Sequence, residues 1–158
     1  MCDLPFSKEI KIPIIRVNIY ERSKNGVILP VVSYSAAGNP LSTQERFEEN
    51  IVVPKRYGKG KNIIAVKIRG DSMKDVGIDD ESIVLVKTGS HFKSGMIGIA
   101  TLGVQYDFGT TCKKIVYEKG EYRLISLNSE KNYEDIVVRS GELRYVGEVV
   151  GIYQLETD

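Results

Sequence analysis

A serine that closely follows a glycine in the segment KIRGDSMKDVGIDD has the setting of a nucleophile. Ser72 comes after a β-rich stretch and Gly70, where a tight turn can present the hydroxyl and leave nearby backbone N–H groups free. A serine hydroxyl is unreactive at neutral pH unless a base takes its proton, and a carbonyl under attack needs donors for its negative charge. A nucleophilic role for Ser72 therefore requires a base that the fold can bring to its hydroxyl.

Histidine is the usual base, but the sequence does not favour one here. The single histidine, His91, lies in the polar loop TGSHFKSG, which predicts a solvent-exposed side chain. A Ser-His triad is therefore disfavoured.

Lysine can replace histidine when burial in apolar surroundings lowers its pKa, because desolvation disfavours the charged ammonium. In TTCKKIVYE, strand alternation places Lys113 on the same face as Ile115 and Tyr117. Lys114 falls on the opposite face, where we expect it to point to water. Spacing alone does not single out Lys113, because lysines on β-strands are ordinary.

Short β-rich segments follow one another from residue 62 onward and must position these side chains. Their spacing predicts a mainly antiparallel, all-β domain, with a tight hairpin centred on Lys119 and Gly120. Helix is predicted only over LSTQERF, residues 41–47, and in a turn that begins at Ser72. The predicted strands are NIIAVKIR (62–69), SIVLVK (82–87), MIGIAT (96–101), VQYDF (104–108), CKKIVYE (112–118), EYRLISL (121–127), DIVVR (135–139) and YVGEVVGIYQ (145–154).

Residues 1–28 are predicted to form an N-terminal arm. Pro5, Pro13 and the turn signal Asn25-Gly26 interrupt this segment, and no 3.6-residue period is sustained. A helix-turn-helix reader needs two or three amphipathic helices, so we expect no direct sequence-specific DNA binding by this chain.

Bulk composition argues against several other classes of protein. Twenty-two Lys and Arg against 21 Asp and Glu give a net charge of +1, so no global attraction to nucleic acid or anionic membranes is expected. Apolar runs such as VILPVV are far shorter than the roughly 20 residues of a membrane helix, and no secretory signal is visible, which predicts a cytoplasmic protein without a membrane partner. Cys2 and Cys112 predict reduced thiols, and neither a metal site nor an organic cofactor is implied.

Four blocks of the sequence match, in order and spacing, a family of self-cleaving regulators. They are AAGNPL (36–41), GDSMKDVGI (70–78), TTCKKI (110–115) and GEVVGI (147–152). Over residues 29–155 the chain resembles the LexA and UmuD class. The resemblance implies a LexA C-terminal-domain-like fold of twisted, partly barrel-like antiparallel sheets. Residues 29–158 would then form the peptidase domain, which includes a cleavable loop at residues 31–41.

The resemblance also implies roles for individual residues. The serine of the G-x-S-M block is the family's nucleophile, which falls on Ser72, and the lysine of the third block falls on Lys113. LexA-like members cut an Ala-Gly bond, which corresponds here to Ala37 and Gly38. No metal or organic cofactor takes part in this chemistry.

The expected reaction begins when neutral Lys113 accepts the proton of Ser72, whose oxygen then attacks the carbonyl of Ala37. Backbone amides of the turn, with the N–H of Ser72 as the natural candidate, would stabilise the oxyanion, and Asp71 and Met73 are expected to shape that turn. Because substrate and catalyst share one chain, local concentration replaces binding affinity.

Two departures from the family pattern leave alternatives open. Residues 79–82 read Asp-Asp-Glu-Ser, where relatives commonly carry Asp-Gly-Asp, so a turn glycine is absent. We also expect no DNA-binding domain of the kind that LexA repressors place before the cleavable loop. The chain is therefore interpreted as a LexA-like regulator of the SOS response to DNA damage without that domain, or as a fragment of a longer repressor. Alternatively, it is an UmuD-like accessory subunit of a translesion DNA polymerase, activated when its arm is removed.

The resemblance further implies partners. Members of the family form homodimers, and their cleavage is stimulated by RecA bound to single-stranded DNA. A membrane-type signal peptidase with Ser-Lys chemistry is disfavoured, because the sequence has no apolar membrane helix.

Overall fold

Short strands joined by turns make up most of the computed structural model, which describes residues 10–18, 26–34, 45–58, 60–103 and 109–156. Short 3₁₀ helices lie between some of the strands: η2 (Lys55–Tyr57), η3 (Lys74–Val76) and η5 (Ser140–Glu142). The strands in these ranges are β1 (Ile14–Val17), β2 (Gly26–Tyr34), β3 (Glu45–Pro54), β4 (Ile63–Lys67), β5 (Ile83–Thr88), β6 (Met96–Leu102), β7 (Gly109–Glu118), β8 (Glu121–Ile125), β9 (Ile136–Arg139) and β10 (Leu143–Leu155).

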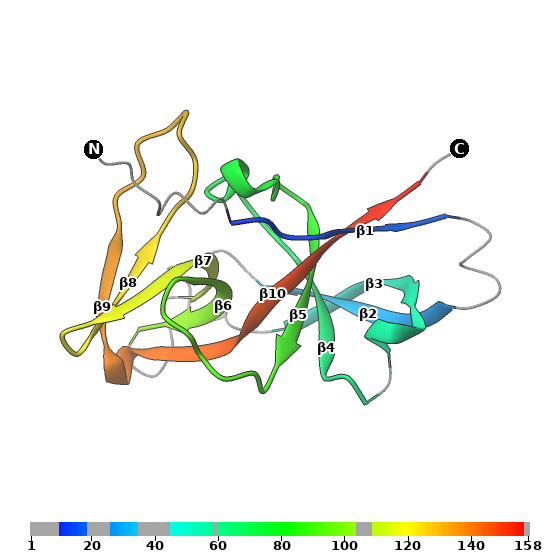
Figure 1. The fold of residues 1–158 in the computed structure, drawn as a ribbon, viewed down its shortest axis with the longest axis horizontal. Helices are drawn as coiled ribbons and strands as arrows, with labels where there is room; N and C mark the ends of the chain where they lie inside the picture. Colours follow the sequence, from blue (N-terminus) through cyan, green and yellow to red (C-terminus); the bar gives the residue numbers. More distant parts are fainter. Residues whose placement is uncertain (1–9, 19–25, 35–44, 59, 104–108, 157–158) are drawn as a thin grey trace.

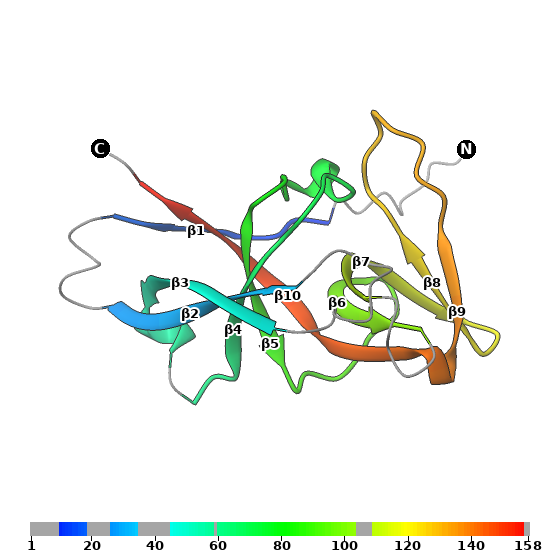
Figure 2. The ribbon, with the colours of Figure 1, turned by 180° about the vertical axis from the view of Figure 1, so that it is seen from behind.

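The strands form one strongly twisted sheet that does not close into a barrel. Its order is β3-β2-β4-β5-β10-β6-β7-β8-β9, and β1 pairs in parallel with the far end of β10. Most pairs are antiparallel, and β2 with β4 is a second parallel pair. The predicted all-β fold is confirmed. Figures 1 and 2 show β10 crossing the molecule as a long diagonal, with β6 to β9 on one side and β1 to β5 on the other.

Strand β10 connects the two sides because it changes partner along its length. Its first residues pair with β6 and its later residues pair with β5, with a register shift against β6 between Tyr145 and Gly147 and one against β5 between Val149 and Gly151. A Cβ atom at Gly147 would lie 2.8 Å from Val86 Cγ1 and would overlap the backbone of Lys87. Only glycine fits at this crossing. This close approach gives a physical reason for the glycine that opens the block GEVVGI.

Three apolar clusters fill the interior of the sheet. The first lies beneath the segment of Ser72 and includes Met73, Ile78 and Cys112. The second joins β1, β2, β3, β4 and β5, and the third packs β6, β7 and β8 against the start of β10. The first cluster contains Met73 and Cys112, the residues next to Ser72 and Lys113 in the chain, so it anchors the backbone at both positions.

The hairpin predicted from the sequence is present in the structure, whereas the predicted helix is not. The hairpin at Lys119 and Gly120 is confirmed, because both residues have positive φ (54° and 80°) between β7 and β8. The helix predicted over residues 41–47 is wrong, since Glu45–Pro54 forms β3, which pairs with β2 along its length. Pairing with a neighbouring strand overrides the weak helix propensity of this segment. Residues 41–44 and the predicted strand at 104–108 lie outside the described residues.

The segment predicted as an N-terminal arm contributes to the sheet. Residues Ile14–Val17 form β1, and β2 begins at Gly26 and continues without a break past residue 29. The pattern IIRV alternates exposed and buried side chains, as in a strand that packs on one face. In the part of the chain that is described, no helix has the length and apolarity needed to cross a membrane.

The crossing at β10 leads to a stability prediction. Gly147→Ala places a methyl group against Val86 and a backbone carbonyl, so we expect a loss of about 1–3 kcal/mol in the free energy of unfolding. Gly141→Ala is the matched control, because a Cβ atom there meets nothing within 4 Å. We expect the control to change stability by less than about 0.5 kcal/mol. Urea denaturation of both variants measures the difference, and equal stabilities would contradict this account of Gly147.

Candidate active site

Ser72 lies in the turn between β4 and the short helix η3. Gly70 makes the bend possible with φ of +92°, and its N–H donates to Asp80 Oδ1 at 2.7 Å. The turn that the sequence predicts from Ser72 is confirmed: it continues into Lys74–Val76 and stops at Gly77, which adopts the left-handed conformation. The hydroxyl of Ser72 is thus carried on a short, tightly bent segment.

Met73 holds this turn from below. Its side chain is almost fully buried in the first apolar cluster. Its carbonyl accepts hydrogen bonds from the N–H groups of Val76 (3.2 Å) and Ile78 (3.3 Å). The residue after Ser72 therefore joins the turn to the hydrophobic core.

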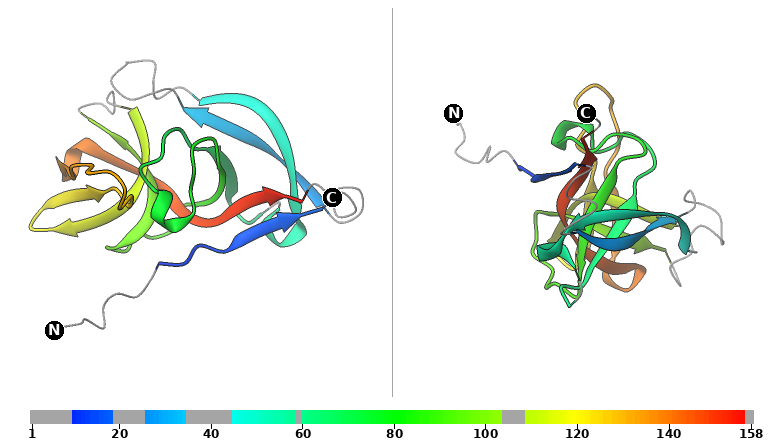
Figure 3. Two further views of the ribbon diagram at one scale, coloured as in Figure 1. Left: turned by 90° about the horizontal axis from the view of Figure 1, so that it is seen from above. Right: turned by 90° about the vertical axis from the view of Figure 1, so that its right-hand side faces the viewer.

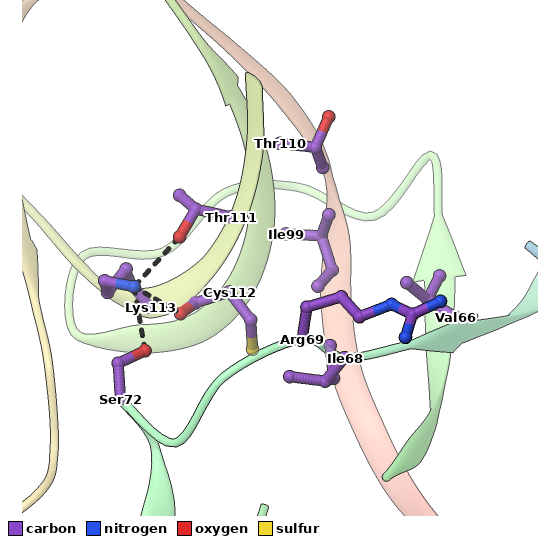
Figure 4. Close-up of a pocket in the computed structure, with 9 residues that line it drawn as sticks. All are labelled: Val66, Ile68, Arg69, Ser72, Ile99, Thr110, Thr111, Cys112 and Lys113. Atoms are coloured by element: carbon purple, nitrogen blue, oxygen red, sulfur yellow. Dashed lines mark hydrogen bonds between the residues drawn. The ribbon is translucent and has the colours of Figure 1, made fainter. Parts of the chain in front are cut away.

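Lys113 reaches Ser72 from strand β7. Its side chain is only 9% exposed, and Nζ lies 2.9 Å from Ser72 Oγ (Figure 4). Nζ also lies 2.9 Å from Thr111 Oγ1 and 3.3 Å from the carbonyl oxygen of Cys112. Burial lowers the pKa of Lys113 below the ordinary value of 10.5, because the charged ammonium loses its water. The structure therefore brings together the two side chains that the sequence predicted as nucleophile and base.

The neighbours of Lys113 on β7 divide between two environments. Ile115 is buried in the third apolar cluster, whereas Cys112 is buried in the first. Burial raises the pKa of the Cys112 thiol to about 12, so the thiol is neutral at pH 7 and is not a competing nucleophile. Lys114, which was expected to point to water, is half-buried. Tyr117 is exposed, so the apolar face around Lys113 extends only as far as Ile115.

A loop between β8 and β9, residues 126–133, holds the turn of Ser72 from the other side. The N–H of Leu127 donates to the carbonyl of Ser72 at 2.7 Å, and the N–H of Asp75 donates to the carbonyl of Leu127 at 2.8 Å. Asn128, which is buried, donates through Nδ2 to the carbonyl of Asp71 at 2.8 Å. Figure 3 shows this loop lying beside the turn. Backbone groups on both sides of Ser72 are therefore fixed by residues more than 50 positions away in the sequence.

The same loop binds the side chain of Asp71. Lys131 Nζ lies 2.6 Å from Asp71 Oδ2, and the hydroxyl of Tyr133 donates to Asp71 Oδ1. These two hydrogen bonds lower the pKa of Asp71, and the carboxylate raises the pKa values of both Lys131 and Tyr133. Sequence reasoning missed this loop, whose only signal is a polar stretch between two predicted strands.

A small pocket opens beside the two side chains. Its volume is about 60 Å³. Figure 4 shows Arg69 on its far side from Lys113. The residues that line it are Val66, Ile68, Arg69, Ser72, Ile99, Thr110, Thr111, Cys112 and Lys113.

The pocket lies next to the strand that leads to the predicted cleavage site. Arg69 Nη2 is 3.5 Å from Ser33 Oγ, and Ser33 belongs to β2, which pairs with β4 on the way to Ser72. Ala37 and Gly38 themselves lie outside the described residues. His91 is exposed and is not among the residues that line the pocket, in agreement with the sequence.

Fold and site together define a class of β-sheet domains in which a serine hydroxyl and a buried lysine amine meet. A family model described as Peptidase S24-like matches residues 30–150, so the chain belongs to the Peptidase S24-like family. It is similar to proteins named LexA repressor: 33% identical to the one from Ruminiclostridium cellulolyticum and 35% to the one from Clostridium tetani. These matches cover 85% and 83% of the chain but only 60% and 62% of the relatives, so the chain spans about three fifths of their length. The predicted LexA-type membership is confirmed.

Burial of Lys113 has a measurable effect on stability. Because the folded-state pKa is lower than the unfolded value of 10.5, the unfolded chain binds more protons between these two values, and stability rises with pH across that window. We therefore expect Lys113→Met to be more stable than the parent at pH 7, with an advantage that shrinks as the pH approaches 10.5. Thermal melts across this pH range measure the difference, and Lys114→Met controls for loss of a positive charge from β7. An advantage that stays constant with pH would contradict this reasoning.

Proposed function

We propose that this chain is a serine endopeptidase that cuts its own backbone between Ala37 and Gly38, with Ser72 as nucleophile and Lys113 as general base. The observation that carries the proposal is the 2.9 Å contact between Lys113 Nζ and Ser72 Oγ in a buried setting. A contact of this length between a serine hydroxyl and an amine of lowered pKa is the arrangement that activates a nucleophile.

The reaction follows from the geometry of these two groups. The neutral amine of Lys113 accepts the hydroxyl proton as Ser72 Oγ bonds to the carbonyl carbon of Ala37. Collapse of the tetrahedral intermediate breaks the bond to Gly38, whose nitrogen takes the proton back from Lys113. Water, deprotonated by Lys113, then hydrolyses the acyl-enzyme and frees the carboxylate of Ala37. Thr111 Oγ1 and the carbonyl of Cys112 orient the amine through the contacts described above.

The oxyanion requires donors that are not used elsewhere in the fold. Among the described residues, the N–H groups of Ser72 and Met73 have no hydrogen-bond partner, although the carbonyls on either side are bonded. We assign the N–H of Ser72 to the oxyanion, and Asp71 and Met73 to support of the turn that aims it. Asp71 does so through Lys131 and Tyr133, and Met73 through its buried side chain.

The substrate segment is supplied by the sheet itself. Strand β2 ends at Tyr34 and runs parallel to β4, whose chain continues to Ser72. Figures 1 and 3 show the end of β2 directed toward β7, the strand that carries Lys113. The bond after Ala37 is therefore only three residues from a strand that is fixed beside the site. The residues at 36–38, Ala-Ala-Gly, are small enough to enter a narrow cleft.

The relatives suggest the biological role. Their name, LexA repressor, supports a regulator of the SOS response whose self-cleavage is stimulated by RecA on single-stranded DNA. It favours this role over that of a polymerase accessory subunit. The test is to incubate the purified chain with RecA filaments and follow cleavage. Acceleration by the complete filament, and not by RecA or DNA alone, is the expected result, and no acceleration would argue against this role.

Self-cleavage and its pH dependence are tested by mass spectrometry of the purified chain over a pH series. We expect two fragments that join at Ala37 and Gly38, with a rate that rises through the lowered pKa of Lys113 and levels off before pH 10.5. Ser72→Ala and Lys113→Met should each lower the rate by roughly 10³-fold or more. His91→Ala is the control and should cleave like the parent, because His91 is exposed. A cut that survives Ser72→Ala would refute the mechanism.

The support given by Asp71 is tested by Asp71→Asn, which removes the charge that binds Lys131. We expect the plateau rate of cleavage to fall roughly tenfold, because Ser72 loses its fixed position, while the pH midpoint set by Lys113 stays unchanged. Asp135→Asn is the matched control, since it breaks an ion pair with Arg123 on the β8–β9 side. Equal rates in the two variants would show that Asp71 does not position the nucleophile.

A further inference from the structure

The residues before the proposed cut contribute two strands to the sheet. Strand β1 pairs with Ile152–Leu155 at the end of β10. At its two ends, the N–H of Ile152 donates to the carbonyl of Pro13 at 2.8 Å and the N–H of Glu156 donates to the carbonyl of Val17 at 2.9 Å. Strand β2 pairs with β3 along its whole length and with β4 at Val31–Ser33. Hydrolysis of one bond beyond Tyr34 breaks none of these interactions.

The same residues supply half of one apolar cluster. Of its eight buried members, Ile15, Val17, Leu29 and Val31 precede the proposed cut, and Val17 and Val31 have no exposed surface. The other four, Ile51, Val53, Ala65 and Leu85, follow it.

Strand β1 also fits closely against the backbone of β10. A Cβ atom at Gly151 would lie 2.8 Å from Ile15 Cγ1, so this glycine allows β1 to approach. Departure of the N-terminal piece would leave a groove lined by apolar side chains and would open the backbone edges of β10 and β4.

We propose that the described residues after the cut form a binding site for extended peptide, that its occupants are the chain's own strands β1 (Ile14–Val17) and β2 (Gly26–Tyr34), and that these strands stay bound after cleavage. Binding is by strand addition: backbone hydrogen bonds hold the peptide, and alternate side chains enter the apolar cluster. The proposal takes only the position of the cut from the proposed function. Its consequence is that hydrolysis by itself leaves the surface covered, and displacement of the two strands is the step that exposes it.

The experiment separates this proposal from the proposed function by using an added protease. A recognition sequence for a site-specific protease is inserted between Ala37 and Gly38 of Ser72→Ala, and the purified full chain is cut completely. We expect gel filtration and native mass spectrometry to show one species that contains both pieces in equal amounts. Two separately eluting pieces without denaturant would overturn the proposal. Either result is independent of whether Ser72 and Lys113 cleave the parent chain.

Matched variants on β1 test whether the buried face holds the peptide. Excess labelled peptide 10–34 is added to the cut protein, and the rate of exchange is measured. Val17→Ala should speed exchange by roughly tenfold, since it removes buried methyl groups, whereas Ile14→Ala on the exposed face should not. Both variants are first shown to melt cooperatively before cutting, and Ile15→Val replaces Val17→Ala if the latter does not fold. Equal exchange rates for the buried and exposed substitutions would overturn the binding mode.

Discussion

The arrangement of this domain depends on keeping an amine out of water. An ammonium group is strongly hydrated, and its burial is costly unless the group becomes neutral. Lys113 is buried among neutral oxygen atoms from Ser72, Thr111 and Cys112, which orient the amine, and no carboxylate of the described residues forms an ion pair with it. Burial of this amine next to the hydroxyl of Ser72 therefore lowers the free energy of unfolding at neutral pH.

Meeting this constraint requires contributions from distant parts of the chain. Ser72 and Lys113 are 41 positions apart, and their separation is set by the sheet between β4 and β7. Strand β10 forms the centre of that sheet and can change partners because Gly147 admits the backbone of β5. The loop at 126–133 then ties the turn to the β8–β9 side. The positions of Ser72 and Lys113 thus depend on two elements, β10 and the loop at 126–133, although neither element carries one of these two side chains.

The segment before the proposed cut is part of the sheet, and this has a further physical effect. A protease that meets its substrate by diffusion releases its products, but here the segment before the bond is built into the core through β1 and β2. The energy that holds these strands comes from pairing and apolar burial, to which the cleaved bond contributes little. If the chain is cut as proposed, cutting the bond and opening the surface are therefore separate events.

The sequence by itself determined the all-β class and the hairpin at Lys119 and Gly120, and it singled out Ser72 and Lys113 as the pair proposed to react. Strand alternation and turn chemistry are local signals, and the four ordered blocks placed the pair within a family. Only the tertiary structure decided that residues 45–54 form a strand, that residues 14–17 join the sheet, and that Asp71 is held by Lys131 and Tyr133. These features depend on contacts between segments far apart in the chain, and a short window of residues carries no information about which segment will lie beside it.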